Sequence, residues 1–182
     1  MHLRFRIQSL PIILTSSLVL LTVSGCARSA PVKPAQNAST RTPSPSPKAI
    51  NEADLTKLRW IEGSWRGTGD EQPPFYERYK FENASTLVVE TLADETLSKV
   101  TDVSRFELKD GHFGSGTNES GSVATALDDN SITFEPLGKS GNSFRFQRES
   151  DNTWTAILNW TDKAGAPKER IYHMTRVTPP KQ

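Results

Sequence analysis

Ten short segments, in which apolar and polar residues alternate, follow one another between residues 63 and 177. A repeat of two is the side-chain period of a β-strand, and the breaks between segments are rich in Gly, Asn, Asp and Ser, which favour tight turns. Short connections join neighbouring antiparallel strands, and a row of strands keeps exposed edges unless the sheet closes. The alternation therefore predicts an all-β fold, an antiparallel up-and-down barrel of about ten strands. The expected strands are 63–68, 75–82, 86–92, 97–108, 112–117, 122–127, 131–136, 143–149, 153–161 and 169–177.

One short helix is expected before the first strand, over residues 52–60. Asn51 has a side chain suited to a helix N-cap, and Asp54 stands at the capping-box position. Gly63 follows as a stop signal. Its apolar residues at helical spacing are Leu55, Leu58 and Ile61.

Residues 1–25 have the features of an export signal, with a basic start and an apolar stretch that ends in small residues. The sequence Leu-Thr-Val-Ser-Gly-Cys, which ends at Cys26, resembles a bacterial lipobox, and Cys26 is the only cysteine of the chain. This resemblance implies a lipoprotein that is acylated at Cys26 and anchored to the membrane of the bacterial cell envelope. Ala27, rather than Asp, follows the cysteine, which resembles the pattern sorted to the outer membrane, facing the periplasm, in cells with two membranes. The alternative is an ordinary secretory signal with an incidental cysteine.

Residues 26–50 read as the lipidated cysteine followed by a disordered linker, because Pro, Ser, Thr and Ala dominate and large apolar residues are nearly absent. Residues 51–180 then form one globular domain of ordinary size. The first fifty residues carry six basic and no acidic residues, which leaves 16 basic against 21 acidic residues in the remainder. An acidic domain of this kind argues against nucleic acid as a partner.

The alternation also assigns side chains to the inner and outer faces of the barrel. Polar residues fall on the inner face beside apolar ones: Glu77, Asp102 and Ser104. A buried charge needs a partner, such as a Glu77–Arg148 ion pair, or a ligand. Inner aromatic side chains either fill a small barrel or line a cavity, and the sequence leaves both open. The candidate ligand contacts are Tyr79, Phe81, Phe144, Phe146, Trp154, Trp160 and Tyr172, with Arg148 or Arg170 as a polar handle.

Gly63-Ser64-Trp65 at the start of the first strand resembles the Gly-x-Trp signature of the calycins, the superfamily of lipocalins and fatty-acid-binding proteins. The resemblance implies that Trp65 closes one end of the barrel. It also implies that Arg176, in the last strand, packs across the tryptophan with a cation–π contact worth about 1 kcal/mol. Gly63, Trp65 and Arg176 are therefore the expected barrel-closure residues.

Two branches of this superfamily carry further implications. The match Gly63-Ser64-Trp65-Arg66-Gly67, followed by Tyr76-Glu77, resembles nitrobindin-type barrels, which hold haem through a histidine; His173 is the candidate here. Arg170-Ile171-Tyr172 has the Arg-x-Tyr spacing with which fatty-acid-binding proteins grip a carboxylate. The two-helix lid of that branch is missing, since only six residues separate Thr68 from Phe75.

The chain offers little for catalysis. It has three histidines, no Cys–His pair in the expected domain and no zinc-ligand spacing. We therefore expect that the protein is not an enzyme and binds no metal ion. The main hypothesis is a membrane-anchored envelope protein whose barrel binds or carries a small hydrophobic ligand, without a cofactor. The alternatives are a packed barrel with a structural or protein-interaction role, and a haem-binding barrel.

Overall fold

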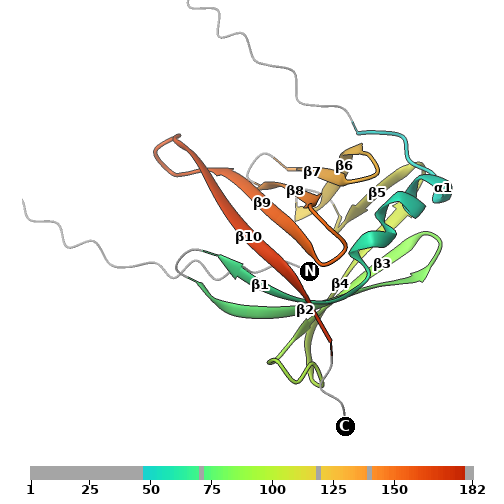
Figure 1. Ribbon diagram of the computed structural model, residues 1–182. Coiled ribbons are helices and arrows are strands. Elements are labelled where there is room, and N and C mark those ends of the chain that lie inside the picture. The colour runs from blue at the N-terminus through green and yellow to red at the C-terminus, as the bar shows by residue number, and fades with distance from the viewer. Residues whose placement is uncertain (1–46, 70–71, 118–119, 139–140, 179–182) are drawn as a thin grey trace, which may run out of the picture. The chain divides into compact units, whose positions relative to one another are not determined.

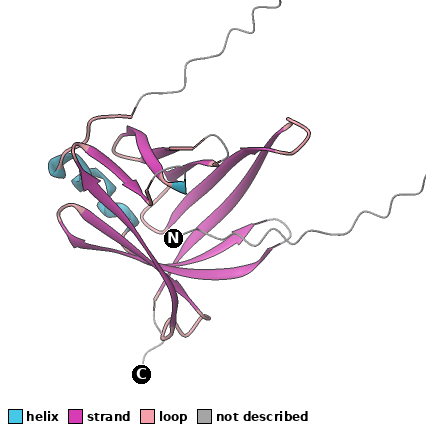
Figure 2. Ribbon diagram, turned by 180° about the vertical axis from the view of Figure 1, so that it is seen from behind, coloured by secondary structure: helices cyan, strands magenta, loops and turns pink. Residues whose placement is uncertain are grey.

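A computed structural model describes residues 47–69, 72–117, 120–138 and 141–178, and ten antiparallel strands dominate this part of the chain (Figures 1 and 2). Cys26, the expected signal peptide and most of the expected linker lie outside the described residues. The strands are β1 (Gly63–Gly69), β2 (Gln72–Asn83), β3 (Thr86–Leu92), β4 (Val100–Lys109), β5 (His112–Ser115), β6 (Ser122–Leu127), β7 (Ser131–Pro136), β8 (Ser143–Arg148), β9 (Thr153–Thr161) and β10 (Pro167–Val177).

The ten strands form one closed barrel in sequence order. Each strand pairs with the next, and β1 pairs with β10, which closes the sheet. At the closure, Trp65 lies opposite Arg176 on one side and Glu77 on the other. This topology confirms the fold class that the alternation predicts. It also follows from the short connections, because each strand returns beside its predecessor.

The helical segment is shorter in its α-helical part than expected. It consists of α1 (Glu52–Leu55), with the Asn51–Asp54 capping box in place, and the 3₁₀-helix η1 (Thr56–Ile61). A 3₁₀-helix has about three residues per turn, so residues three apart lie on one line. The three apolar residues of the segment have this spacing and are all buried: Leu55, Leu58 and Ile61. No helix in the described ranges is both long and apolar enough to span a bilayer.

The chain before β1 covers one end of the barrel, which we call the closed end. The backbone N–H of Lys48 donates to the Ala124 carbonyl, and that of Ile50 donates to the Gly111 carbonyl (3.1 and 2.8 Å). Ile50 is buried and joins the same apolar cluster as the helical segment. Lys48 and Ile50, which the sequence reading gave to the linker, are thus bound to the barrel.

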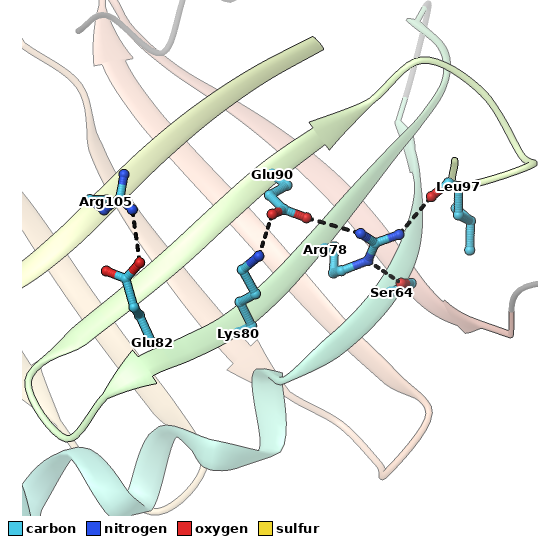
Figure 3. A network of polar contacts seen from close by, with 7 residues as sticks. All are labelled: Ser64, Arg78, Lys80, Glu82, Glu90, Leu97 and Arg105. Atoms are coloured by element: carbon cyan, nitrogen blue, oxygen red, sulfur yellow. Dashed lines mark hydrogen bonds and ion pairs between the residues drawn. The ribbon is translucent and has the colours of Figure 1, made fainter. Parts of the chain in front are cut away.

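The outer face of β1–β4 carries a network of charged side chains (Figure 3). Glu90 contacts Lys80 and accepts from Arg78 at 3.0 Å. Arg78 also donates to Ser64 Oγ and to the carbonyl of Leu97 (2.6 Å), so the connection between β3 and β4 is tied to the barrel wall. The hydrogen bond from Lys80, with the positive charges of Lys80 and Arg78, lowers the pKa of Glu90.

Candidate functional site

The two halves of the barrel interior differ in burial. Near the closed end, most inward-facing side chains form one apolar cluster and are almost completely inaccessible, although Phe81 and Leu108 stay partly exposed there. Towards the opposite end, which we call the mouth, inward-facing side chains stay partly exposed although they point away from the outer surface. The buried set includes Trp65, Tyr79, Phe106, Phe113, Phe134, Phe146, Trp154 and Met174. The partly exposed set comprises Phe75, Glu77, Thr91, Ser104, Ser115, Ser122, Phe144, Leu158, Trp160 and Arg170.

Small polar side chains line one wall of the mouth half. Thr91 and Ser104 lie on the inner faces of β3 and β4, and Ser115 and Ser122 share a hydrogen bond of 3.0 Å between β5 and β6. Ser104 and Ser115 are much smaller than the Phe side chains two positions nearer the closed end on the same strands. This wall therefore carries smaller side chains in the mouth half than in the closed half.

The facing wall of the mouth half is apolar. Phe144 of β8 stacks on Phe134 with ring centroids 4.6 Å apart, and Leu158 of β9 pairs with Phe144 across the sheet. Phe144 and Leu158 are only partly buried against the core cluster. An inner surface with one apolar and one polar wall suits a small amphipathic molecule.

Glu77 is the acidic side chain at the centre of the inner face. Its Oε2 accepts a hydrogen bond of 2.7 Å from the Tyr79 hydroxyl. Removal from bulk water raises the pKa of Glu77, and the Tyr79 hydrogen bond offsets only part of this effect. The same burial, together with the neighbouring carboxylate, raises the pKa of Tyr79 well above its usual range. Glu77 is thus a group that can hold a proton inside the lumen.

Arg170 and Tyr172 lie together on the inner face of β10. Arg170 Nη1 donates to the Tyr172 hydroxyl at 3.4 Å, and its guanidinium stands 5.7 Å from the centroid of the Trp160 ring. The Tyr172 ring is buried edge-on against Phe75, with centroids 5.3 Å apart. Arg170 is the more accessible member of the pair.

Trp65 and Arg176 make the stacked contact at the closed end. The Arg176 guanidinium carbon lies 4.1 Å from the Trp65 ring centroid. Arg176 also donates to the backbone carbonyls of Glu62, Trp60 and Asp151 at 2.8, 3.2 and 2.9 Å. Gly63 has a φ of 126°, and a Cβ there would lie 2.2 Å from Arg176 Nη1, so the arginine occupies the space that a side chain would need.

Five of the nine candidate ligand contacts lie in the closed half or at its rim rather than in the mouth half. Three of them, Tyr79, Phe146 and Trp154, are core residues whose rings meet edge-on. Phe81 lies under the guanidinium of Arg59 at 4.1 Å. Arg148 pairs with Asp151 and not with Glu77, because β8 ends at the closed end and takes Arg148 with it.

His173 does not face the lumen. It lies between the inward-facing Tyr172 and Met174, pairs with Thr68 and Thr155, and is exposed. Haem bound inside the barrel through His173 is therefore incompatible with the phase of β10. His112 is exposed as well. Within the described ranges, no three His, Cys, Asp or Glu side chains gather in a way that could hold a metal ion.

Several mouth residues have no place among the candidate contacts. The alternation that places their neighbours on the inner face also places Phe75 and Leu158 there. Glu77 was expected on the inner face. Ser115 and Ser122 belong to short segments of small residues, in which hydrophobic alternation gives no signal. Their place on the inner face follows only from the pairing of the assembled strands.

Comparison with known proteins gives a fold likeness only. No protein-family model matches the chain, and no curated protein matches it. A redesigned β-barrel aligns at 13% identity over 67% of this chain and 96% of its own, with a TM-score of 0.34. EF1p2_mFAP2b, solved bound to DFHBI, aligns at 11% identity over 66% of this chain and 97% of its own, with a TM-score of 0.36. The closed ten-strand barrel is shown by the strand pairing of the structure itself.

Proposed function

We propose that the barrel binds or carries a small hydrophobic ligand in its mouth half and is not an enzyme. The observation that carries the proposal is the contrast between the two halves of the interior: the closed half is filled by large side chains, and the mouth half keeps partly exposed inner side chains. A barrel with a structural role alone has no need of accessible aromatic rings on its inner face. Ligand sites usually combine apolar side chains with a few placed polar groups, and the inner face of the mouth half carries both.

The polar groups of the mouth half suggest how such a ligand is oriented. Arg170 offers guanidinium donors beside Trp160, and guanidinium groups pair strongly with carboxylates. The apolar part of the ligand then lies against Phe144 and Leu158. Glu77, whose pKa is raised by burial, offers a carboxyl group for one hydrogen bond deeper in the lumen. A weakly acidic amphipathic molecule satisfies all three features.

A single substitution separates this proposal from a packed barrel. Ser104→Phe places a ring on the inner face of β4 in the mouth half. If the lumen has space, the ring fills it, blocks the binding of Nile red (a neutral apolar dye), and leaves the free energy of unfolding unchanged or higher. If the lumen is packed, the same ring overpacks it and costs about 1–3 kcal/mol.

Val103→Phe is the matched control. Val103 neighbours Ser104 on the same strand but pairs with Glu90 on the outer face, so the same ring there should leave dye binding intact. Dye binding that survives in Ser104→Phe, or a loss of stability in that variant alone, would contradict the proposal.

We further propose that the protein is a lipoprotein of the bacterial cell envelope, with the membrane as partner through lipid on Cys26. The support is the lipobox-like sequence before the only cysteine of the chain. Two or more acyl chains suffice for stable anchoring. Expression in a bacterial host should give a chain that is heavier by its acyl groups and that sediments with membranes. The Cys26→Ser variant should carry no acyl groups and should not sediment with membranes. An unmodified wild-type cysteine would contradict this proposal and leave the ligand proposal untouched.

A further inference from the structure

A second recess lies at the closed end, outside the lumen. It is a groove of about 420 Å³ lined by Arg59, Trp60, Arg148, Asp151, Asn152 and Arg176, which we call the arginine groove. Its residues come from η1, from the end of β8 and the β8–β9 turn, and from the end of β10. Three guanidinium groups therefore converge from parts of the chain that are far apart in sequence.

Arg176 gives the groove a fixed positive charge. All its hydrogen bonds in the described residues go to backbone carbonyls, which are neutral, and its flat face is stacked on Trp65. No carboxylate of the described ranges forms an ion pair with it, so its charge is solvated but not cancelled. A cation held rigidly at the edge of a recess attracts an anion without any cost of ordering the arginine side chain.

Arg148 and Arg59 are held by ion pairs with exposed or partly exposed carboxylates, which a ligand can replace. Arg148 pairs with Asp151, whose side chain is 86% exposed, and Arg59 pairs with Glu62 at 3.2 Å, with both side chains more than a third exposed. Exposed ion pairs of this kind contribute about 1 kcal/mol or less, so an incoming anion can replace them. Each guanidinium keeps further N–H donors for an anion.

We propose that the arginine groove binds a phosphate group. The three arginines of the groove and their ion-pair partners, Asp151 and Glu62, carry a net charge of +1, which favours an anion such as a phosphate monoester, whose charge near neutral pH is about −2. The fork of a guanidinium matches the geometry of phosphate oxygens, and the Asn152 amide adds a neutral donor. The source of the phosphate is either the headgroup of an anionic lipid or a free phosphate, and the site is independent of the lumen.

Calorimetric titration of the full chain tests the proposal with two probes, inorganic phosphate and dihexanoyl phosphatidic acid below its micelle concentration. We expect saturable binding with a Kd of about 1 mM or tighter. Binding of phosphatidic acid about tenfold tighter than phosphate identifies a lipid headgroup as the source, and equal affinities identify free phosphate.

Three variants make the assignment specific. Arg148→Gln should weaken binding about tenfold, and Asp151→Asn, which removes the competing carboxylate, should tighten it several-fold. Arg105→Gln removes an exposed arginine paired with Glu82 on the outer face of β4 and should leave the Kd unchanged. If Arg148→Gln does not fold, Arg59→Gln takes its place, with the same expected weakening. No saturable binding, equal weakening in Arg105→Gln, or unchanged affinity in Asp151→Asn would overturn the proposal.

Discussion

Arg176 joins three stretches of chain that would otherwise meet only at the barrel seam. Its guanidinium bonds to carbonyls before β1 and in the β8–β9 turn, while its own strand pairs with β1. Trp65 supplies the surface on which it stacks. The residue therefore contributes to the fold through geometry that a lysine, with one ammonium group, does not reproduce.

Replacing Arg176 should have a large effect on stability. Arg176→Ala removes three charge-assisted hydrogen bonds and the cation–π contact, and we expect it to lower the free energy of unfolding by roughly 2–4 kcal/mol. Urea unfolding followed by tryptophan fluorescence measures this change. Arg105→Ala, which removes only an exposed ion pair, should cost about 1 kcal/mol or less. Equal costs in the two variants would mean that Arg176 is not part of the closure.

Glu77 should make the protein less stable as the pH rises. Its pKa is raised in the folded state, so the folded state holds the proton more tightly than the unfolded state does. The contribution of Glu77 to stability is therefore fully present below the ordinary pKa of glutamate and is lost as the pH rises through the folded pKa. Glu77→Gln keeps an acceptor for Tyr79 but cannot ionise. Its advantage in unfolding free energy over the wild type should grow as the pH rises from the ordinary pKa of glutamate, about 4.3, through the folded pKa.

Glu82→Gln serves as the control for this titration. Glu82 lies on the same strand but is half-exposed and paired with Arg105. It should not reproduce the growing advantage. Parallel stability curves for Glu77→Gln and the wild type would show that Glu77 is fully hydrated.

At the scale of elements, the strands were predictable and the content of the lumen was not. Each of the ten strands overlaps the segment in which the alternation places it, with ends that differ by up to three residues, because period two and turn residues are local properties of the sequence. The switch from α1 to η1 was missed, although the spacing of Leu55, Leu58 and Ile61 fits both helix types. Packing against the barrel end selects the tighter one.

The half of the lumen to which a residue belongs depends on its distance from the strand end and on the stagger of neighbouring strands. Phe144 and Phe146 are two residues apart on one face of β8, yet Phe146 is core and Phe144 is partly exposed towards the mouth. Arg148, two residues further, has left the lumen and pairs with Asp151. Alternation predicts whether a side chain points into or out of the barrel. The register between strands decides how far it lies from either end.

The wall formed by β1–β4 should depend on Glu90. Its pKa is lowered by the hydrogen bond from Lys80 and by the nearby charges, so its contribution to stability is present above the ordinary glutamate pKa. That contribution is lost as the pH falls through the folded pKa. Glu90→Gln should lower the free energy of unfolding by about 1–3 kcal/mol at pH 7. The difference from the wild type should vanish in acid, and a difference that persists there would contradict this account.

At the scale of the molecule, the sealed end of the barrel and the half with accessible inner side chains lie at opposite ends. The closed end is sealed by the segment before β1 and by Trp65 and Arg176, and the mouth half keeps the accessible inner surface. In a barrel sealed at one end, a ligand can enter the lumen only through the opposite end. The arginine groove lies at the sealed end, so the two proposed sites do not compete for space.

The native mass of the full chain, purified from the envelope of a bacterial host, tests the central claim most directly. Our account predicts a discrete non-covalent addition to the mass of the chain, or one that appears on incubation with Nile red, and its absence in Ser104→Phe. The bare mass of the wild type, both as purified and after incubation with the dye, would contradict a ligand-binding lumen.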